Sequence, residues 1–251
     1  MKRILIPTDF SEQAENALKV AAQIAKKHGS EIYVLNSLEL PSNLSNSGST
    51  GSMPESLFFI KLAEKQFEEL LKKPYLKDLL LHEAIIGHGE IFNDVSEVVK
   101  EKNIDLIIMG SHGTNGFMEM FIGSNTEKVV RTSKIPVLVI KNEHLEFKTD
   151  NFVYATDFSE ECKVPFEEAQ KFAEVTNSHL NLLYVNTPSE FKTSKKINKR
   201  IKDFLKDFNT EKINTHIYND TSVEKGILNF ANEINANLIG MGTHGRKGIS
   251  H

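Results

Sequence analysis

The chain has little cysteine, no tryptophan and no long apolar run. Cys162 is the only cysteine among 251 residues, so an internal disulfide bond is excluded. A lone thiol is typical of a reducing compartment, and we therefore expect a cytoplasmic protein. No apolar stretch approaches the roughly 20 residues that a membrane-spanning helix needs. Asp9 interrupts the first apolar run too early for a signal peptide, so we expect no membrane partner.

An excess of positive charge is also absent. The chain carries 30 basic and 34 acidic residues, which gives a net charge of −4. Proteins that bind nucleic acid through phosphate contacts usually present a strongly basic surface. The composition therefore argues against a nucleic-acid partner. One local basic run, KTSKKINKR at 192–200, is interpreted as an exposed loop or helix start, with a docking surface for an acidic partner as the alternative.

The most informative feature that is present is an internal repeat. The pentapeptide TDFSE occurs at 8–12 and again at 156–160, each time directly after an apolar run. Two further pairs keep the same order: SEIYVLNSL (30–38) with SHLNLLYVN (178–186), and NIDLIIMGSHG (103–113) with NANLIGMGTHG (235–245). Repeats of this length indicate two domains of one design. We place them at residues 1–143 and 149–251.

Within each copy, strand-like runs alternate with helical patterns. Alternating strands and helices predict a doubly wound α/β domain with a parallel sheet. Ser11 is the expected N-cap of the first helix and Gly29 its expected stop. In the first copy we expect strands at 3–8, 31–38, 80–86, 105–110 and 136–141, and helices at 11–28, 55–71, 90–101 and 124–132.

The two copies differ in two places. The first copy contains a polar stretch at 41–56, rich in Ser, Gly and Asn, that has no counterpart in the second. We expect an inserted flexible loop there, which need have no function. The second copy ends at His251, before the residues that would match the last helix and strand of the first. We therefore expect the second domain to lack these two elements.

The motifs that carry chemistry follow the first and fourth strands. Ligands of open α/β sheets bind beyond the carboxyl ends of the strands. Asp9 follows the first strand, and the pattern G-x-x-G-x9-G-S follows the fourth, from Gly110 to Ser124. Glycine lets the backbone approach a phosphate, and the free N–H groups of a helix start attract an anion. Asp9 can accept hydrogen bonds from a ribose or help to hold a metal, so we expect a nucleotide site.

These motifs, in this order and twice along the chain, resemble the universal stress protein family and in particular its ATP-binding branch. The resemblance implies a tandem of two universal stress protein folds of the adenine nucleotide alpha hydrolase-like class. It implies ATP or AMP as the ligand, with Mg²⁺ as a candidate companion ion. The nucleotide-contacting positions that it implies are Asp9, Ser37, Met109, Gly110, Gly113, Gly123 and Ser124 in the first copy, and Asp157, Val185, Met241, Gly242 and Gly245 in the second.

The first copy departs from the family pattern at one of these positions. The residue that faces the base after the second strand is usually a small aliphatic one. Val185 supplies such a residue in the second copy, whereas the first copy has Ser37. The resemblance also implies that the apolar strand PVLVIK, at 136–141, pairs with another domain of this chain or with a second copy in a homodimer. Val137 and Val139 would then be covered.

Other sites are disfavoured. The sequence GMGTHG at 240–245 fits the dinucleotide fingerprint GxGxxG, but it follows a fourth strand where that fingerprint follows a first. The pattern GxxxxGK[ST] does not occur, so the chain is not a Walker-type ATPase. The pattern SGGxDS does not occur after the first strand either, which excludes the ATP-pyrophosphatase relatives. His112 and His244 fall at matching positions, but no partnered Ser, Cys or carboxylate sits beside either. We interpret each as a residue that shapes its turn or contacts phosphate peripherally, with a general base as the alternative. We therefore predict no catalytic and no metal-ligating residue.

The expected function is adenine-nucleotide binding in stress response or signalling. A slow ATP hydrolase is one alternative, although no paired base and nucleophile is evident. A dimerisation or scaffold protein that binds no nucleotide is the other.

Overall fold

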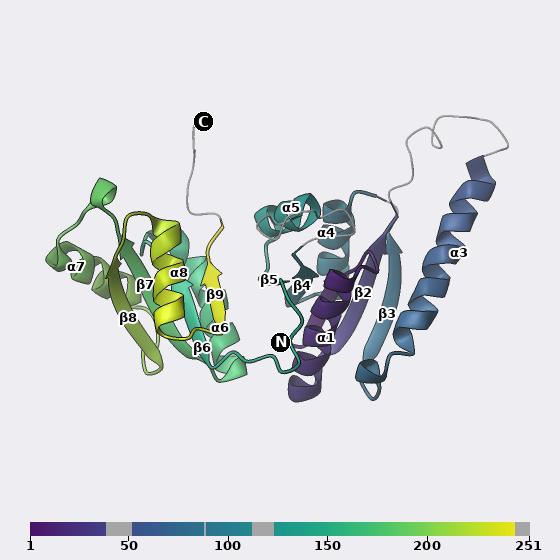
Figure 1. Cartoon of the computed structure of the whole chain (residues 1–251), viewed down its shortest axis with the longest axis horizontal. Coiled ribbons are helices and arrows are strands. Elements are labelled where there is room, and N and C mark those ends of the chain that lie inside the picture. The colour runs from purple at the N-terminus through teal and green to yellow at the C-terminus, as the bar shows by residue number, and fades with distance from the viewer. Residues whose placement is uncertain (39–51, 88, 112–122, 244–251) are drawn as a thin grey trace. The chain divides into compact units, whose positions relative to one another are not determined.

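The computed structural model describes residues 1–38, 52–87, 89–111 and 123–243 (Figure 1). The chain divides into two compact units, Met1–Phe147 and Lys148–His251, and each is described here by itself. The domain limits expected from the sequence, 1–143 and 149–251, stay a prediction. Both units are α/β domains with a parallel sheet, as the repeat predicts. Among the described residues, no helix is both long and apolar enough to cross a bilayer.

The first domain is built on a five-stranded sheet in the order β3-β2-β1-β4-β5. All four strand pairings are parallel. The chain moves outward from β1 to β3 on one side and from β4 to β5 on the other, so the carboxyl ends of β1 and β4 form a switch point. The strands are β1 (Arg3–Pro7), β2 (Glu31–Ser37), β3 (Leu81–Gly87), β4 (Leu106–Gly110) and β5 (Val137–Ile140).

Helices cover both faces of this sheet. Val95 and Val98 from α4 and Val129 from α5 pack on one face, against Leu5 and Leu35. On the strands the neighbouring side chains point the other way, toward the layer that contains α1. The helical elements are α1 (Glu12–His28), α3 (Ser52–Leu71), the 3₁₀ turn η1 (Pro74–Leu76), α4 (Ile91–Lys102) and α5 (Ser124–Thr132).

Two expected helix ends are confirmed and one is wrong. Ser11 caps α1 by accepting a hydrogen bond from the N–H of Ala14 at 3.2 Å, and Gly29 ends it with φ of 66°. The helix expected from residue 55 begins at Ser52, inside the stretch assigned to an inserted loop. Pro54 is compatible with that start because the first turn of a helix needs no N–H from it. The rest of that stretch, up to residue 51, lies outside the described residues.

The second domain repeats this plan with a four-stranded parallel sheet in the order β8-β7-β6-β9. In the described part of this domain there is no counterpart of α5 or β5. Helix α7 begins within the basic run that was expected to be a loop or helix start. The elements are β6 (Asn151–Ala155), η2 (Glu160–Cys162), α6 (Lys163–Thr176), β7 (His179–Asn186), η3 (Pro188–Glu190), α7 (Ser194–Leu205), β8 (Ile213–Asn219), α8 (Val223–Glu233) and β9 (Leu238–Met241).

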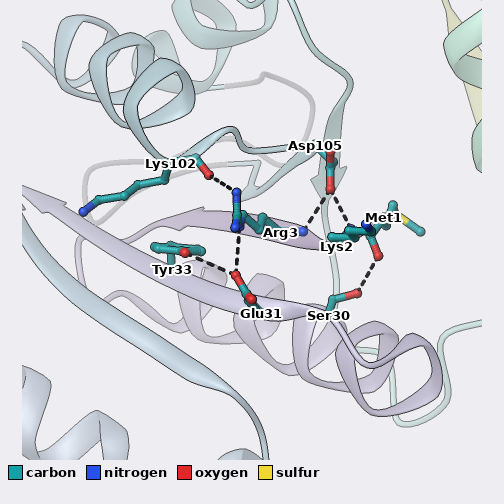
Figure 2. A network of polar contacts seen from close by, with 8 residues as sticks. All are labelled: Met1, Lys2, Arg3, Ser30, Glu31, Tyr33, Lys102 and Asp105. Carbon is teal, nitrogen blue, oxygen red and sulfur yellow. Dashed lines mark hydrogen bonds and ion pairs between the residues drawn. The ribbon is translucent and has the colours of Figure 1, made fainter.

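A polar network ties together the amino ends of β1, β2 and β4 (Figure 2). The main-chain N–H groups of Lys2 and Arg3 both donate to Oδ2 of Asp105, at 2.6 and 3.0 Å. The guanidinium of Arg3 donates to Glu31 at 2.9 Å and to the carbonyl of Lys102 at 3.1 Å. These contacts fix one end of the sheet, and the candidate site lies at the opposite, carboxyl end.

Candidate functional site

The turn after β1 is the first element of the site. The N–H of Thr8 donates to the carbonyl of Leu35 at 2.7 Å, which continues the pairing of β1 with β2. Phe10 then adopts a φ of 63°, and its N–H donates to Oγ1 of Thr8 at 3.0 Å. Oδ1 of Asp9 accepts from the N–H of Ser11 at 3.0 Å. The turn places the exposed Asp9 at the carboxyl edge of the sheet.

The second domain builds the same turn atom for atom. The N–H of Thr156 donates to the carbonyl of Leu183 at 3.0 Å, and the N–H of Phe158 donates to Oγ1 of Thr156 at 3.0 Å. Phe158 has a φ of 57°, and Oδ1 of Asp157 accepts from the N–H of Ser159 at 2.9 Å. The repeated pentapeptide therefore encodes one specific turn in both domains.

The phenylalanine of each turn explains why its unfavourable backbone persists. A left-handed conformation of a residue other than glycine costs on the order of 1–3 kcal/mol. The ring of Phe10 packs against Phe67 of α3, with centroids 5.1 Å apart, and that of Phe158 packs against Phe204 of α7 at 5.3 Å. Burial of these rings offsets the cost and holds the aspartates in place.

Gly110, at the end of β4, is required by the packing of α1. A Cβ at this position would lie 2.7 Å from the backbone C and O atoms of Gln13. At the matching Gly242 the three nearest atoms to a Cβ all belong to side chains: two of Pro165, at 3.2 and 3.3 Å, and the hydroxyl oxygen of Tyr154, at 3.6 Å. The close approach of α1 therefore explains why residue 110 is a glycine, whether or not a ligand binds. The predicted contacts Gly113 and Gly245 lie outside the described residues, as do His112 and His244.

The start of α5 is fixed beside the end of β4. The N–H of Gly123, its N-cap, donates to the carbonyl of Ser111 at 2.7 Å, and Oγ1 of the buried Thr126 donates to the carbonyl of Gly110 at 2.9 Å. Within the described residues no side chain caps the first turn, which begins with the exposed Ser124. Uncapped N–H groups and the positive end of the helix dipole favour an anion. The sequence analysis did not identify Thr126, which would have required knowing that α5 starts beside Gly110.

The two methionines assigned to the site lie in different surroundings. Met109 is 5% exposed and packs in the core beneath α4 and α5. Met241 is 55% exposed, because β9 is an edge strand of the described second sheet. Met109 is thus a packing residue of the first domain, and it directly precedes Gly110 in the sequence.

Ser37, the unusual residue of the first copy, belongs to a polar cluster. Its hydroxyl donates to Oδ2 of Asp94, on the first turn of α4, and lies 3.3 Å from the carbonyl of Gly89. The N–H of Gly89 also donates to Oδ2 of Asp94, at 3.2 Å. The matching Val185 instead packs against Gly226, where a Cβ would lie only 2.5 Å from Cγ1 of the valine. The sequence analysis named Ser37 and Val185 but did not identify Asp94 and Gly226.

Asp157 differs from Asp9 in its surroundings. Arg200, on α7, lies with Nη2 3.6 Å from Oδ2 of Asp157 and donates from Nε to the carbonyl of Phe158 at 3.3 Å. The thiol of Cys162 lies 3.4 Å from Oδ1. Burial alone would raise the pKa of Asp157, but hydrogen bonds from Ser159 and Cys162 and the charge of Arg200 hold that pKa below its ordinary value. The second aspartate is therefore engaged by a cation of its own domain.

The first domain has no charge at the position of Arg200. Counting back from the paired rings of Phe67 and Phe204, Arg200 matches Ala63, which is 2% exposed. Within the described residues, no group of three or more His, Cys, Asp or Glu side chains is placed to hold a metal ion.

In the first domain the predicted residues from three neighbouring strands meet at one edge. Asp9 follows β1, Gly110 ends β4 beside Gly123 and Ser124, and Ser37 ends β2. This arrangement can hold the anionic end of a ligand at the start of α5. A polar ring system of the same ligand can then lie toward the end of β2. The residues of the second domain form the corresponding edge without a described counterpart of α5.

The family of the chain follows from this fold and these motifs. The model of the universal stress protein family matches residues 1–141 and again 148–251, so the chain belongs to this family as a tandem of two such domains. Universal stress protein MJ0577 of Methanocaldococcus jannaschii is 33% identical over 158 residues, which cover 57% of this chain and 96% of the relative. Universal stress protein MJ0531 of the same organism is 31% identical, with 58% and 85% covered.

Solved structures agree with this assignment. The structure of MJ0577 has a TM-score of 0.50 at 30% identity and covers 57% of this chain and 97% of that protein. A universal stress protein from Archaeoglobus fulgidus has a TM-score of 0.66 at 24% identity and covers 98% of this chain and 86% of that protein. The second likeness extends over both domains and supports the tandem fold.

Proposed function

We propose that the protein binds an adenine nucleotide, ATP or AMP, at the carboxyl edge of its first domain and acts in stress response or signalling. The observation that carries the proposal is the start of α5, which no described side chain caps and which is anchored through Gly123 and Thr126 to the end of β4. Such a helix start is suited to a phosphate group. The resemblance of the G-x-x-G-x9-G-S pattern to the ATP-binding branch of the family supports the same ligand.

The proposed arrangement assigns a part of the nucleotide to each strand end. The phosphates lie against the N–H groups at Ser124, the ribose hydroxyls donate to Asp9 beyond β1, and the base lies toward Ser37 beyond β2. Mg²⁺, where present, would be held chiefly by phosphate oxygens. We propose weaker binding in the second domain, because its described residues include no counterpart of the start of α5.

The apolar edge strand β5 supports a further part of the proposal. Leu138 and Ile140 are buried, whereas Val137 and Val139 are half-buried. In the described sheet β5 pairs with β4 alone. An open apolar edge strand promotes association. We propose that a second copy of this chain, or the second domain, covers β5, and that the protein works in the cytoplasm.

The test of the nucleotide proposal starts from the purified protein. Denaturation followed by mass spectrometry of the released small molecules is expected to yield ATP or AMP. Gly113→Val is expected to abolish binding by blocking the backbone approach to the phosphates. Unchanged affinity of a folded Gly113→Val variant would contradict the phosphate assignment. ATP that stays intact during incubation with the protein would indicate a binding protein. Loss of ATP would indicate a hydrolase.

A further inference from the structure

We infer that Asp94 is a specificity-determining residue, which selects a base that carries an exocyclic amine on the edge facing β2 and β3. This inference rests on the proposed nucleotide function and names what the base end of that site recognises. Asp94 was not identified from the sequence. Its role follows from three features: the position of its carboxylate, the orientation of that carboxylate, and the glycine that stands at the matching position of the second domain.

The first feature is position. Ser37 and Gly87 are paired neighbours at the carboxyl ends of β2 and β3, and Asp94 lies directly above them on the first turn of α4. By strand alternation Ser37 shares its face with Leu35, which packs in the core under α4 and α5. The start of α5 therefore opens on the same face. A nucleotide with its phosphates there and its sugar at the turn after β1 extends its base toward Asp94.

The second feature is orientation. Oδ2 of Asp94 accepts hydrogen bonds from the hydroxyl of Ser37 and from the N–H of Gly89. A Cβ on Gly87 would lie 2.6 Å from Cγ of Asp94, so the glycine makes the room that the carboxylate fills. Within the described part of the chain, Oδ1 has no hydrogen-bond donor. One oxygen is thus used to fix the group, and the other remains as an acceptor.

The third feature is the contrast with the second domain. There the matching pair is Val185 and Gly226, and no side chain fits at Gly226 because a Cβ would lie 2.5 Å from the valine. Asp220 lies nearby, with its Cβ 3.1 Å from the position of a Cβ on Gly226. Both of its carboxylate oxygens already accept hydrogen bonds, Oδ1 from Thr221 and Oδ2 from Asn229. The same position of the fold therefore carries an oriented carboxylate in one domain and a methyl surface in the other.

The chemistry of an ionised carboxylate gives the selection rule. An ionised carboxylate only accepts hydrogen bonds. Adenine presents an amine donor at its six-position, whereas hypoxanthine presents a carbonyl acceptor there, which would leave two acceptors facing each other. Sites built around a hydrogen bond reject ligands that cannot form it. We expect the wild-type protein to bind ATP at least about tenfold more tightly than inosine triphosphate, which corresponds to about 1.4 kcal/mol.

The experiment compares dissociation constants of ATP and inosine triphosphate for the full chain. Asp94→Asn keeps an oxygen for Ser37 and Gly89 and places an NH₂ donor where Oδ1 lies. We expect the preference for ATP to disappear or invert in this variant. Glu97→Gln makes the same change of charge at an exposed position of the same helix, and it is expected to keep the wild-type ratio.

Each outcome decides one question. Equal binding of both nucleotides by the wild type, or an unchanged ratio in a folded Asp94→Asn variant, overturns the role of Asp94 while the proposed function stands. If the wild type binds neither nucleotide, the proposed function and this inference both fail. Should Asp94→Asn not fold, Ser37→Ala replaces it. Loss of the hydroxyl frees the carboxylate from its orientation, so the ATP preference must fall, and an unchanged preference overturns the inference.

Discussion

At the scale of single residues, the duplicated turn shows how one replacement alters an otherwise identical arrangement. Asp9 and Asp157 occupy the same turn, with the same hydrogen bonds to the backbone. Arg200 stands where the first domain has the buried Ala63, and it brings a positive charge to Asp157. The start of α5, which has no counterpart in the described part of the second domain, is the physical basis for assigning the nucleotide to the first domain.

The glycine at the end of β4 gives the first prediction. Gly110→Ala places a methyl group 2.7 Å from the backbone of Gln13, which cannot move without displacing α1. We expect the free energy of unfolding to fall by about 1–3 kcal/mol, as measured by urea denaturation. Gly242→Ala is the matched control, because its new methyl group meets the side chain of Pro165 at 3.2 Å. An equal or larger loss for Gly242→Ala would contradict this account.

His216 gives a prediction on pH. Burial lowers the pKa of its imidazole below the ordinary value of 6.5. The ring lies 4.8 Å from that of Phe230, and Nε2 lies 3.0 Å from Oδ1 of Asn181. Because the folded pKa is the lower one, the unfolded chain binds the proton more readily. This contribution to stability is complete above about pH 6.5 and is lost as the pH falls below it.

The measurement compares the wild type with His216→Gln. Urea denaturation at pH 7.5 and at pH 5.5 should show a larger loss of stability for the wild type than for the variant. Subtraction of the variant removes the effect of every other titrating group. Parallel losses in the two proteins would show that His216 is not responsible.

At the scale of elements, the two copies begin their first helices differently. Ser11 caps α1, whereas the matching Ser159 donates to Sγ of Cys162 and the chain first forms the 3₁₀ turn η2. We expect Ser11→Ala to cost about 1 kcal/mol of stability and Ser159→Ala no more than about 0.5 kcal/mol. Thermal or urea unfolding measures both. Equal costs would mean that the cap of α1 contributes nothing particular.

The sequence predicts these elements well because their signals are local. The spacing of apolar residues, the helix cap at Ser11 and the helix end at Gly29 are each read from a few neighbouring residues. The elements that these signals predict are present in the structure. The start of α3 at Ser52 was missed because the polar composition of residues 41–56 was taken to indicate a loop. The last residues of that stretch, from Ser52 on, belong to the helix. Asp94, Thr126 and Arg200 could not be predicted, because their roles depend on which strand ends and helices become neighbours.

At the scale of the whole molecule, the first domain has one apolar edge strand, β5, which within the described residues pairs with β4 alone. We predict that β5 is covered in solution, by a second copy or by the second domain. Val139→Asp should therefore reduce the mass measured by analytical ultracentrifugation or lower the stability of the protein, because it places a charge in the covered surface. A wild-type monomer with Val137 and Val139 exposed, and no effect of Val139→Asp, would contradict the prediction.

The central claim is that main-chain N–H groups at the start of α5 hold the phosphates of an adenine nucleotide. The most direct test follows the backbone amide resonances of Ser124 and Asn125 by NMR during titration with ATP and, separately, with adenosine. The account predicts large shifts of both resonances with ATP and much smaller ones with adenosine, which has no phosphate. Resonances that stay in place when ATP is added, or that respond equally to adenosine, would contradict it.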